Sequence, residues 1–255
     1  MSNTSLGDRM KMYENVERRY LTKGLPLIVR VDGKAFHSFT KGFERPYDAQ
    51  FRSVMWLTTL DLCENIMGCK LGYTQSDEIT LLLTDDDSLE TQPWFGKNLQ
   101  KIVSIAASMA TCYFNKRARE EAEDAPVRIA AEKKCAMFDA RAFILPHKEV
   151  MNCFEWRQQD ATRNAIESLG QYYFSHNQLN GKACNEIQDM LMTEHGVNFN
   201  DMPTWFKRGA CVIKKPYELE TPDGQKMVRP KWTVDMEIPI FHKEPKYIED
   251  LVYHI

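Results

Sequence analysis

Two acidic positions at the ends of apolar strands constrain this chain most. An apolar run that begins at Leu25 ends at Asp32, and a second run, residues 79–83, closely follows Asp77. A carboxylate at the end of a buried strand is costly unless something binds it, and a divalent cation is a natural partner. If the two strands are neighbours in a sheet, their carboxylates meet. The pattern therefore predicts a Mg²⁺ site for phosphoryl or nucleotidyl transfer.

Composition narrows the class of protein. The chain has 255 residues and a formal net charge of −3, which argues against a basic protein that coats nucleic acid. An enzyme with a local basic groove is still compatible with this charge. The first residues lack the apolar core of a signal peptide, and no apolar run approaches the roughly 20 residues that span a bilayer. The seven cysteines include no Cys-x-x-Cys pair, so we expect reduced thiols in a cytoplasmic protein without structural zinc.

Hydrophobic periodicity predicts the elements of the first half. Alternation over residues 25–32 predicts a strand in which Arg30 and Asp32 share one face. Asp48 is a suitable N-cap for the next helix, and Gly68 is suited to end it. Further elements are expected as strands at 71–75, 78–83 and 135–144 and a helix at 97–119. This order resembles a βαββαβ plan and predicts an α+β fold, with an antiparallel sheet covered by helices on one face.

The second half is expected to form an extension on this core. Its predicted helices are 152–174 and 185–194, the latter ended by Gly196. Two strands, 209–213 and 227–238, are expected to form a hairpin whose turn is Pro222-Asp223-Gly224. We therefore predict a catalytic core over 1–145 and a helical and β-hairpin extension over 146–255. Residues 241–255 give little signal.

The acidic positions also supply the candidate metal ligands. Asp32, Asp77 and the backbone carbonyl of Gly33 offer oxygen donors for two Mg²⁺ ions, with substrate phosphates completing the coordination. Glycine at position 33 permits close approach of backbone and ligand. Taken singly, each acidic residue is also a common turn former. Two of them on one predicted edge, with Arg30 beside them, favour the metal site.

Basic residues nearby are candidate phosphate contacts. Lys34 and Arg45 follow the first motif, and Lys97 and Lys101 lie four apart near a predicted helix start, where the helix dipole assists anion binding. The alternative for the last two is a solvated helix face. His37 either contacts a phosphate or base or has a structural role. The triplet at residues 85–87 is expected to be a solvated acidic loop rather than a second metal site.

Residues 156–164 are dense in hydrogen-bonding groups. Arg157 and Asp160 are three apart and Asp160 and Asn164 four apart, so they lie along one helix face. From the sequence, an internal brace and a nucleic-acid contact are equally good interpretations of this segment.

Several of these stretches together resemble the tRNA-histidine guanylyltransferase superfamily, which adds nucleotides in the 3′-to-5′ direction. Any one motif is weak, but the ordered set is specific and extends to about residue 215. The stretches that carry the resemblance are residues 7–14, 30–37, 73–78, 138–141 and 156–160, with a weaker match at 207–209.

The resemblance implies a palm domain like that of polymerases and nucleotidyl cyclases, running in the opposite chemical direction. It implies a homotetramer that acts on tRNA with ATP, GTP and other nucleoside triphosphates and with two Mg²⁺ ions. The expected steps are activation of a 5′-phosphate by ATP, attack by the 3′-hydroxyl of the incoming nucleotide, and removal of pyrophosphate. The catalytic residues are then expected to be Asp32, Asp77 and Glu78, and the metal ligands Asp32, Gly33 and Asp77. Nucleotide contacts are expected from Asp32, Gly33, Lys34, Ala35, Phe36, His37, Arg45, Ser76, Asp77, Lys97 and Lys101, and RNA contacts from Arg141, Arg157, Arg163 and Asn164.

The chain departs from the family pattern at two places. Eukaryotic guanylyltransferases look like Asp-Cys-His-Ile-Asn-Asn where residues 160–165 stand here, so Thr162 replaces a histidine. This change resembles the bacterial and archaeal-type relatives, which repair 5′-truncated tRNA by template-dependent addition. Arg45 stands where relatives usually have lysine, so the charge is kept while the geometry differs.

Four functions compete at this point. The first is template-dependent 3′-5′ addition to tRNA, and the second is addition of a single guanosine at position −1 of tRNA-His, which Thr162 disfavours. A nucleotidyl cyclase would share the palm but has no need of residues 150–215. A non-catalytic RNA-binding module has no need of Asp32 and Asp77. The sequence names neither the physiological RNA nor the base preference, and it assigns no role to residues 216–255.

Overall fold

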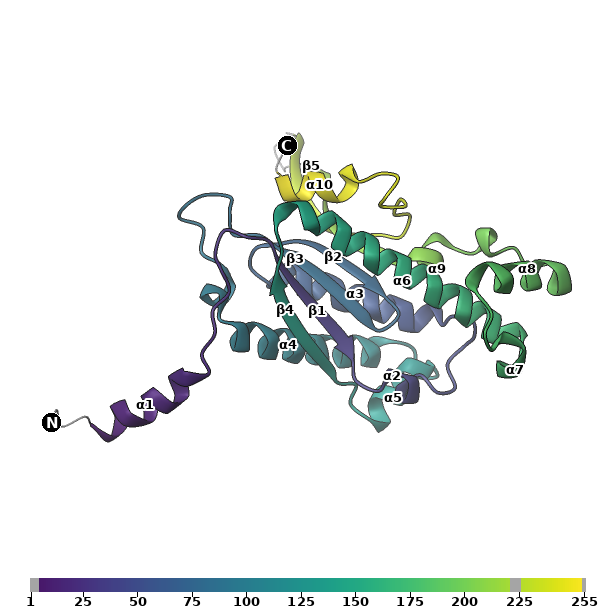
Figure 1. Cartoon of the computed structure of the whole chain (residues 1–255), viewed down its shortest axis with the longest axis horizontal. Coiled ribbons are helices and arrows are strands. Elements are labelled where there is room, and N and C mark those ends of the chain that lie inside the picture. The colour runs from purple at the N-terminus through teal and green to yellow at the C-terminus, as the bar shows by residue number, and fades with distance from the viewer. Residues whose placement is uncertain (1–4, 221–225, 254–255) are drawn as a thin grey trace.

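A single antiparallel sheet organises the molecule. The computed structural model describes residues 5–220 and 226–253, and its six-stranded sheet has the order β4-β1-β3-β2-β5-β6. This confirms the α+β class and the antiparallel sheet (Figure 1). The strands are β1 Leu27–Gly33, β2 Cys69–Gln75, β3 Glu78–Leu83, β4 Phe138–Ile144, β5 Ala210–Glu220 and β6 Lys226–Asp235.

One face of the sheet packs on two long helices, α3 (Ala49–Asn65) and α4 (Leu99–Glu120). Val29 and Val31 of β1 point into this core and are fully buried. The side chain of Asp48 accepts the backbone N–H of Phe51 at 2.8 Å, which confirms it as the N-cap of α3. Helix α4 begins two residues later than predicted, because Lys97 has a positive φ of 61° that a helix does not accommodate.

The opposite face is covered by α6 (His147–Tyr173). Ile28 of β1 and Leu82 of β3 pack there with Val150 and Phe154 of α6, and all four side chains are completely buried. The prediction of helices on one face only therefore holds for the first half of the chain. Helix α6, from the second half, covers the other face (Figure 1). Arg30 and Asp32 point to this α6 side, because they alternate with Val29 and Val31.

The antiparallel pairing of the two predicted C-terminal strands is confirmed by β5 and β6, and this pair is part of the main sheet. β5 pairs with β2 and extends the main sheet, and β6 forms its edge. The predicted turn Pro222-Asp223-Gly224 lies within the stretch 221–225, outside the described residues. A third apolar cluster joins α6 to the small helices α7 (His176–Leu179), α8 (Cys184–His195), η2 (Phe199–Asp201) and α9 (Thr204–Arg208).

Gly196 ends α8 with a left-handed φ of 66°, as predicted. The elements that the sequence patterns did not predict are α1 (Leu6–Val16), α2 (Phe36–Phe39), η1 (Trp94–Lys97), α5 (Pro126–Lys133), α7, η2, α9 and α10 (Lys246–Tyr253). Helix α1 projects from the body and buries none of its residues (Figure 1). Among the described helices, none combines the length and apolar character needed to cross a membrane.

Candidate active site

Strand pairing brings the two predicted acidic motifs together. β1 and β3 are antiparallel neighbours, and their register places Asp32 opposite Glu78. The backbone N–H of Gly33 donates to the carbonyl of Asp77 at 3.1 Å, which fixes the end of β1 against the turn between β2 and β3. The predicted adjacency of Asp32 and Asp77 in the sheet is therefore confirmed.

A row of carboxylates crosses the end of the sheet. Asp139 of β4 pairs with Asp32, which in turn pairs with Glu78, and paired residues of antiparallel strands share a face. Arg141 lies beside this row, with its Nη2 3.8 Å from an oxygen of Asp32 and 3.4 Å from one of Asp139. The predicted RNA contact Arg141 is thus a half-exposed neighbour of the acidic cluster. Asp139 belonged to a recognised motif, but its place in this row appears only when β4 is paired.

Two carboxyl groups at this end of the sheet, those of Asp77 and Glu78, have a raised pKa. Burial is the main cause of the raised pKa of Asp77, and the charge of Asp32 raises it further. Burial likewise raises the pKa of Glu78, although Arg157 and Arg30 oppose this effect. A bound cation would relieve both the desolvation and the repulsion at Asp77.

The donor set fits a hard cation. Two carboxylates and the nearby carbonyl of Gly33 are oxygen ligands, and Mg²⁺ is commonly held by one or two carboxylates together with substrate phosphates. Within the described residues, no group of three or more Asp, Glu, His or Cys side chains is arranged as a metal cage.

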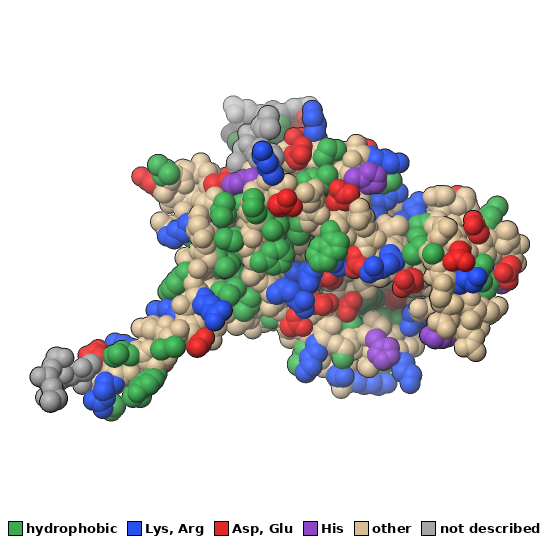
Figure 2. All heavy atoms as spheres, in the orientation of Figure 1, with side chains coloured by type: hydrophobic (Ala, Val, Ile, Leu, Met, Phe, Trp, Pro, Cys, Tyr) green, Lys and Arg blue, Asp and Glu red, His purple; other side chains and the backbone are tan. Residues whose placement is uncertain are grey.

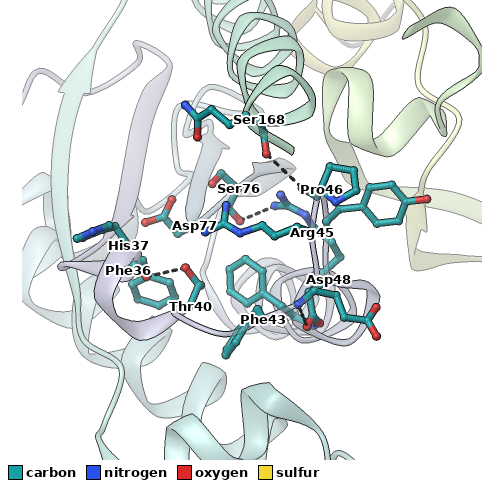
Figure 3. Close-up of a pocket in the computed structure, with 15 residues that line it drawn as sticks. Phe36, His37, Thr40, Phe43, Arg45, Pro46, Asp48, Ser76, Asp77 and Ser168 are labelled. Atoms are coloured by element: carbon teal, nitrogen blue, oxygen red, sulfur yellow. Dashed lines mark hydrogen bonds between the residues drawn. The ribbon is translucent and has the colours of Figure 1, made fainter. Parts of the chain in front are cut away.

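A pocket of about 410 Å³ opens beside Asp77. Its walls come from α2, the loop before α3, the start of α3, the β2–β3 turn and α6 (Figure 3). Figure 3 shows His37 and Asp77 on one side and Arg45 and Pro46 on the other, with Ser168 of α6 above. Five of the predicted nucleotide-binding residues line it, namely Phe36, His37, Arg45, Ser76 and Asp77.

Arg52 is a pocket residue that the sequence analysis missed. Its Nη1 donates to the carbonyl of Ser76 at 3.0 Å, and so holds the turn that carries Asp77. Burial lowers the pKa of Arg52 to about 10, against the opposing charges of Asp77 and Asp48. Its position in the first turn of α3, four residues after the Asp48 cap, was a usable signal, because a charged residue there is unusual in an otherwise apolar segment.

The turn after β1 is exposed at Lys34 and Ala35 and closely packed at Gly33 and Phe36. Ala35 has a left-handed φ of 56°, and both Lys34 and Ala35 are exposed. The Phe36 ring is only 3% exposed and contacts the rings of Phe39, Phe51, Phe114 and Phe138. A Cβ at Gly33 would lie 2.3 Å from the Phe36 ring, so this ring makes glycine necessary there.

Arg157 is an internal brace, which decides between the two interpretations of its segment. Its Nε donates to Glu78 at 2.8 Å and its Nη2 to Asp160 at 2.7 Å, and its side chain is 7% exposed. The predicted RNA contact of Arg157 is therefore corrected, because the guanidinium is buried between two carboxylates. Asp160 also binds Arg163, whose side chain is exposed, as is that of Asn164. RNA contacts by these two residues stay predictions.

Lys97 is likewise in the interior. Its Nζ pairs with Asp85 at 2.8 Å and donates to the carbonyls of Thr22 and Leu25, and the side chain is 2% exposed. The predicted phosphate contact of Lys97 is wrong for this reason, and Asp85 is a buried partner rather than part of a solvated loop. Lys101 is exposed near the start of α4. Lys97 thus lies at the beginning of β1, and Asp32 is at the other end of this strand, about 17 Å away.

Comparisons with known proteins identify the family and agree with the fold. The family model of tRNAHis guanylyltransferases matches residues 7–146. An uncharacterized protein of Acanthamoeba polyphaga mimivirus is 32% identical over 84% of this chain and 78% of its own length. The tRNA(His) guanylyltransferase of Debaryomyces hansenii is 28% identical over 81% of this chain and 80% of its own length.

Solved structures give a stronger match. A bacterial tRNA-His guanylyltransferase-like protein in complex with ATP has a TM-score of 0.87 and 47% identity, covering 98% of this chain and 99% of that one. Such a protein in complex with GTP has a TM-score of 0.79 and 44% identity, covering 97% and 99%. The Saccharomyces cerevisiae guanylyltransferase, at a TM-score of 0.67 and 22% identity over 86% and 95%, shares the fold.

The fold and the matched family define this chain as a nucleotidyltransferase. It belongs to the tRNAHis guanylyltransferase family.

The buried pair of Lys97 and Asp85 gives a stability prediction. Lys97→Ala leaves Asp85 buried without its cation, so we expect the free energy of unfolding to fall by about 3–5 kcal/mol. Lys101→Ala, which removes an exposed lysine four residues away, is expected to change it by less than about 0.5 kcal/mol. Urea unfolding followed by circular dichroism measures both. A Lys97→Ala protein as stable as wild type, with weakened ATP binding, would restore the phosphate contact.

Proposed function

We propose that this protein is a template-dependent 3′-5′ nucleotidyltransferase that adds nucleotides to the 5′ end of tRNA, as in repair of 5′-truncated tRNA. The observation that carries the proposal is the meeting of Asp32 and Asp77 beside a pocket of about 410 Å³. Its support from likeness is the 47% identity, over nearly the whole chain, to a bacterial guanylyltransferase-like protein in complex with ATP.

The proposal includes a palm-like core over 1–145 and an extension over 146–255. Two features support a palm: the carboxylates lie on adjacent central strands β1 and β3, and α3 and α4 cover the face away from them. The extension adds α6 over the acidic face and lengthens the sheet with β5 and β6. A palm built in this way presents its carboxylates at a strand end, where a metal and a nucleotide can reach them.

Asp32, Asp77 and the Gly33 carbonyl would hold the Mg²⁺ ions. Bound there, such ions supply charge neutralisation of the phosphates and activation of the attacking hydroxyl. The protein itself contributes position. Arg52 fixes the turn at Ser76 that carries Asp77, and Arg157 holds Glu78 in the carboxylate row.

The pocket supplies the nucleotide site. The exposed imidazole of His37 and the guanidinium of Arg45 line it and can donate to phosphate oxygens, and the hydroxyl of Ser76 lies next to Asp77. In the reaction, ATP activates the 5′-phosphate of the RNA with loss of pyrophosphate. The 3′-hydroxyl of the incoming nucleoside triphosphate then displaces AMP, and removal of its own pyrophosphate leaves a new 5′-monophosphate.

Thr162 supports templated addition over addition of a single guanosine. Its hydroxyl donates to the carbonyl of Gln158 at 3.0 Å within α6, so the side chain is engaged by its own helix. A threonine in this position offers neither the reach nor the proton chemistry of the imidazole found in the eukaryotic branch. The Debaryomyces hansenii relative is nevertheless named a tRNA(His) guanylyltransferase, and addition of a single guanosine is the second candidate.

The exposed apolar side chains of α1 bear on how the protein assembles. Helix α1 carries exposed Leu6, Met10 and Tyr13 on a segment that projects from the body, and apolar surface of this kind supports self-association. We propose a homotetramer that works in the cytoplasm, in keeping with a tRNA-processing family.

Templated addition is tested directly. The purified protein is incubated with Mg²⁺, ATP and all four nucleoside triphosphates, together with labelled 5′-monophosphorylated tRNA that lacks its first nucleotide. We expect addition of the nucleotide that pairs with the opposing base, and a loss of at least about 100-fold in Asp77→Ala because a metal ligand is removed. Changing the opposing base is the matched control. Addition of G whatever base stands opposite would support the single-guanosine candidate instead.

The raised pKa of Asp77 predicts a pH-dependent gain from removing its charge. The folded protein binds the Asp77 proton more tightly than the unfolded chain, so this group's stabilising contribution is lost as pH rises through the raised pKa. In metal-free buffer we therefore expect Asp77→Asn to raise Tm at pH 8, with a gain that shrinks toward acidic pH.

Adding Mg²⁺ with ATP tests whether Asp77 is also a metal ligand. Wild type should gain Tm by ligand linkage, while Asp77→Asn should gain little. Asp124→Asn, at an exposed position, serves as the control and should behave as wild type. Equal Mg²⁺-dependent gains in all three proteins would contradict the assignment of Asp77 as a ligand.

A further inference from the structure

A second concavity lies between α2 and α5, outside the nucleotide pocket. It has a volume of about 510 Å³, and we call it the lysine groove because Lys41, Lys133 and Lys134 line it. Figure 2 shows Lys and Arg side chains gathered along the lower edge of the molecule, over α2 and α5. We infer that the lysine groove binds the phosphate backbone of the RNA whose 5′ end reaches the candidate active site. This inference rests on the proposed function.

The charges of the groove are available to a ligand. Across residues 5–220 and 226–253, no ion pair joins Lys41, Lys133 or Lys134 to a carboxylate, and all three lysines are exposed. The adjacent acid, Glu132, is engaged by Arg128 at 3.0 Å. Three uncompensated cations around one hollow create a local positive potential on a protein whose net charge is −3.

The floor of the groove suits a polymer rather than a small anion. Phe39 and Phe43 form part of it, and Ile129 of α5 is 37% exposed at its side. Lysine stems pack along apolar surface of this kind while their ammonium groups stay in water. A backbone of alternating sugars and phosphates matches such a surface, because sugars contact the apolar floor and phosphates meet the rim.

The groove adjoins the candidate active site. Phe43 lines both the lysine groove and the nucleotide pocket. Lys34 directly follows the motif of Asp32 and Gly33, and its backbone N–H donates at 2.8 Å to the carbonyl of Met137, three residues after Lys134. An RNA with its 5′-phosphate at Asp32 therefore has a short route past Lys34 to the groove.

Charge also favours RNA over the other occupants. The predicted cations Lys97 and Arg157 are buried in ion pairs and are closed to a polyanion. The triphosphate of a nucleotide already has Arg45 in its own pocket, on the wall opposite Asp77. A protein partner would have to neutralise the same three lysines with acidic groups, whereas the proposed substrate brings a row of phosphates.

The test compares two triple variants that lose the same charge. One carries Lys41→Ala, Lys133→Ala and Lys134→Ala; the control carries Lys148→Ala, Lys243→Ala and Lys246→Ala, exposed lysines on the α6 and α10 side. Fluorescence anisotropy measures the Kd for labelled 5′-truncated tRNA over a range of salt concentrations, and calorimetry measures the Kd for Mg²⁺-ATP. Thermal unfolding establishes that both variants are folded.

We expect the groove variant to bind tRNA at least about 10-fold more weakly near 0.15 M salt, with a slope of log K against log salt reduced by about 2–3. Its Kd for Mg²⁺-ATP should be unchanged, and the control should bind both ligands as wild type. An unchanged tRNA Kd and slope would overturn the proposal, as would weakened ATP binding with normal tRNA binding. Equal losses of tRNA affinity in both variants would also overturn it, because they would show that total charge matters and the position of the lysines does not.

The addition assay is run on the same proteins. A groove variant that fails to bind tRNA while wild type adds nucleotides supports both proposals. If wild type binds tRNA through the groove but adds no nucleotide, the proposed function fails and the groove stands. If wild type adds nucleotides and the groove variant binds tRNA normally, the groove fails and the proposed function stands.

Discussion

The antiparallel pairing of β1 with β3 is the constraint on which the site depends. Six residues of β1 pair in register with β3, and the hydrogen bond from Gly33 to Asp77 closes the end of that ladder. A shift by one residue would turn Asp32 away from the face that it shares with Glu78. Register is strongly specified here because Val29 and Val31 must stay buried against α3 and α4. Core packing on one face thus positions the carboxylates on the other.

The carboxylates of the acidic face differ in how far nearby arginines neutralise them. Glu78 is neutralised by Arg157 and approached by Arg30 at 4.0 Å, so it is a paired carboxylate of the site. Asp77 has weaker compensation, and burial together with Asp32 raises its pKa. The cluster therefore contains one internally satisfied acid next to a pair that a divalent cation would stabilise. This difference between neighbouring carboxylates supports the proposal that Asp32 and Asp77 hold the metal while Glu78 has a supporting role.

The sequence predicted what local periodicity controls. Alternation in β1, the Asp48 cap and the Gly196 stop all depend on near neighbours, and each is confirmed. The meeting of Asp32 and Asp77 was also predictable, because hairpin strands 71–75 and 78–83 have few alternatives to pairing with the first strand. Helices α1 and α2 escaped because the first buries nothing and the second has four residues.

The errors concern partners distant in sequence. Arg157 binds Glu78 across 79 positions and Lys97 reaches Thr22 across 75, and no spacing rule reveals such pairs. The spacing of Lys97 and Lys101 predicted that both lie on one face of a helix. Lys97 instead precedes the helix in a left-handed conformation, and its side chain points inward. The fold also brings Lys133 and Lys134 near Lys41 around one hollow. The order of charges along the sequence does not predict this grouping.

We propose that Asp32 and Asp77 together hold a divalent cation. The most direct measurement is an anomalous difference map from crystals grown with Mn²⁺, which substitutes for Mg²⁺, and a nucleoside triphosphate. The account predicts a peak within about 2.3 Å of a carboxylate oxygen of both Asp32 and Asp77, as direct coordination by oxygen ligands requires. A peak bound only by the nucleotide phosphates, or located at other acidic residues, would contradict it.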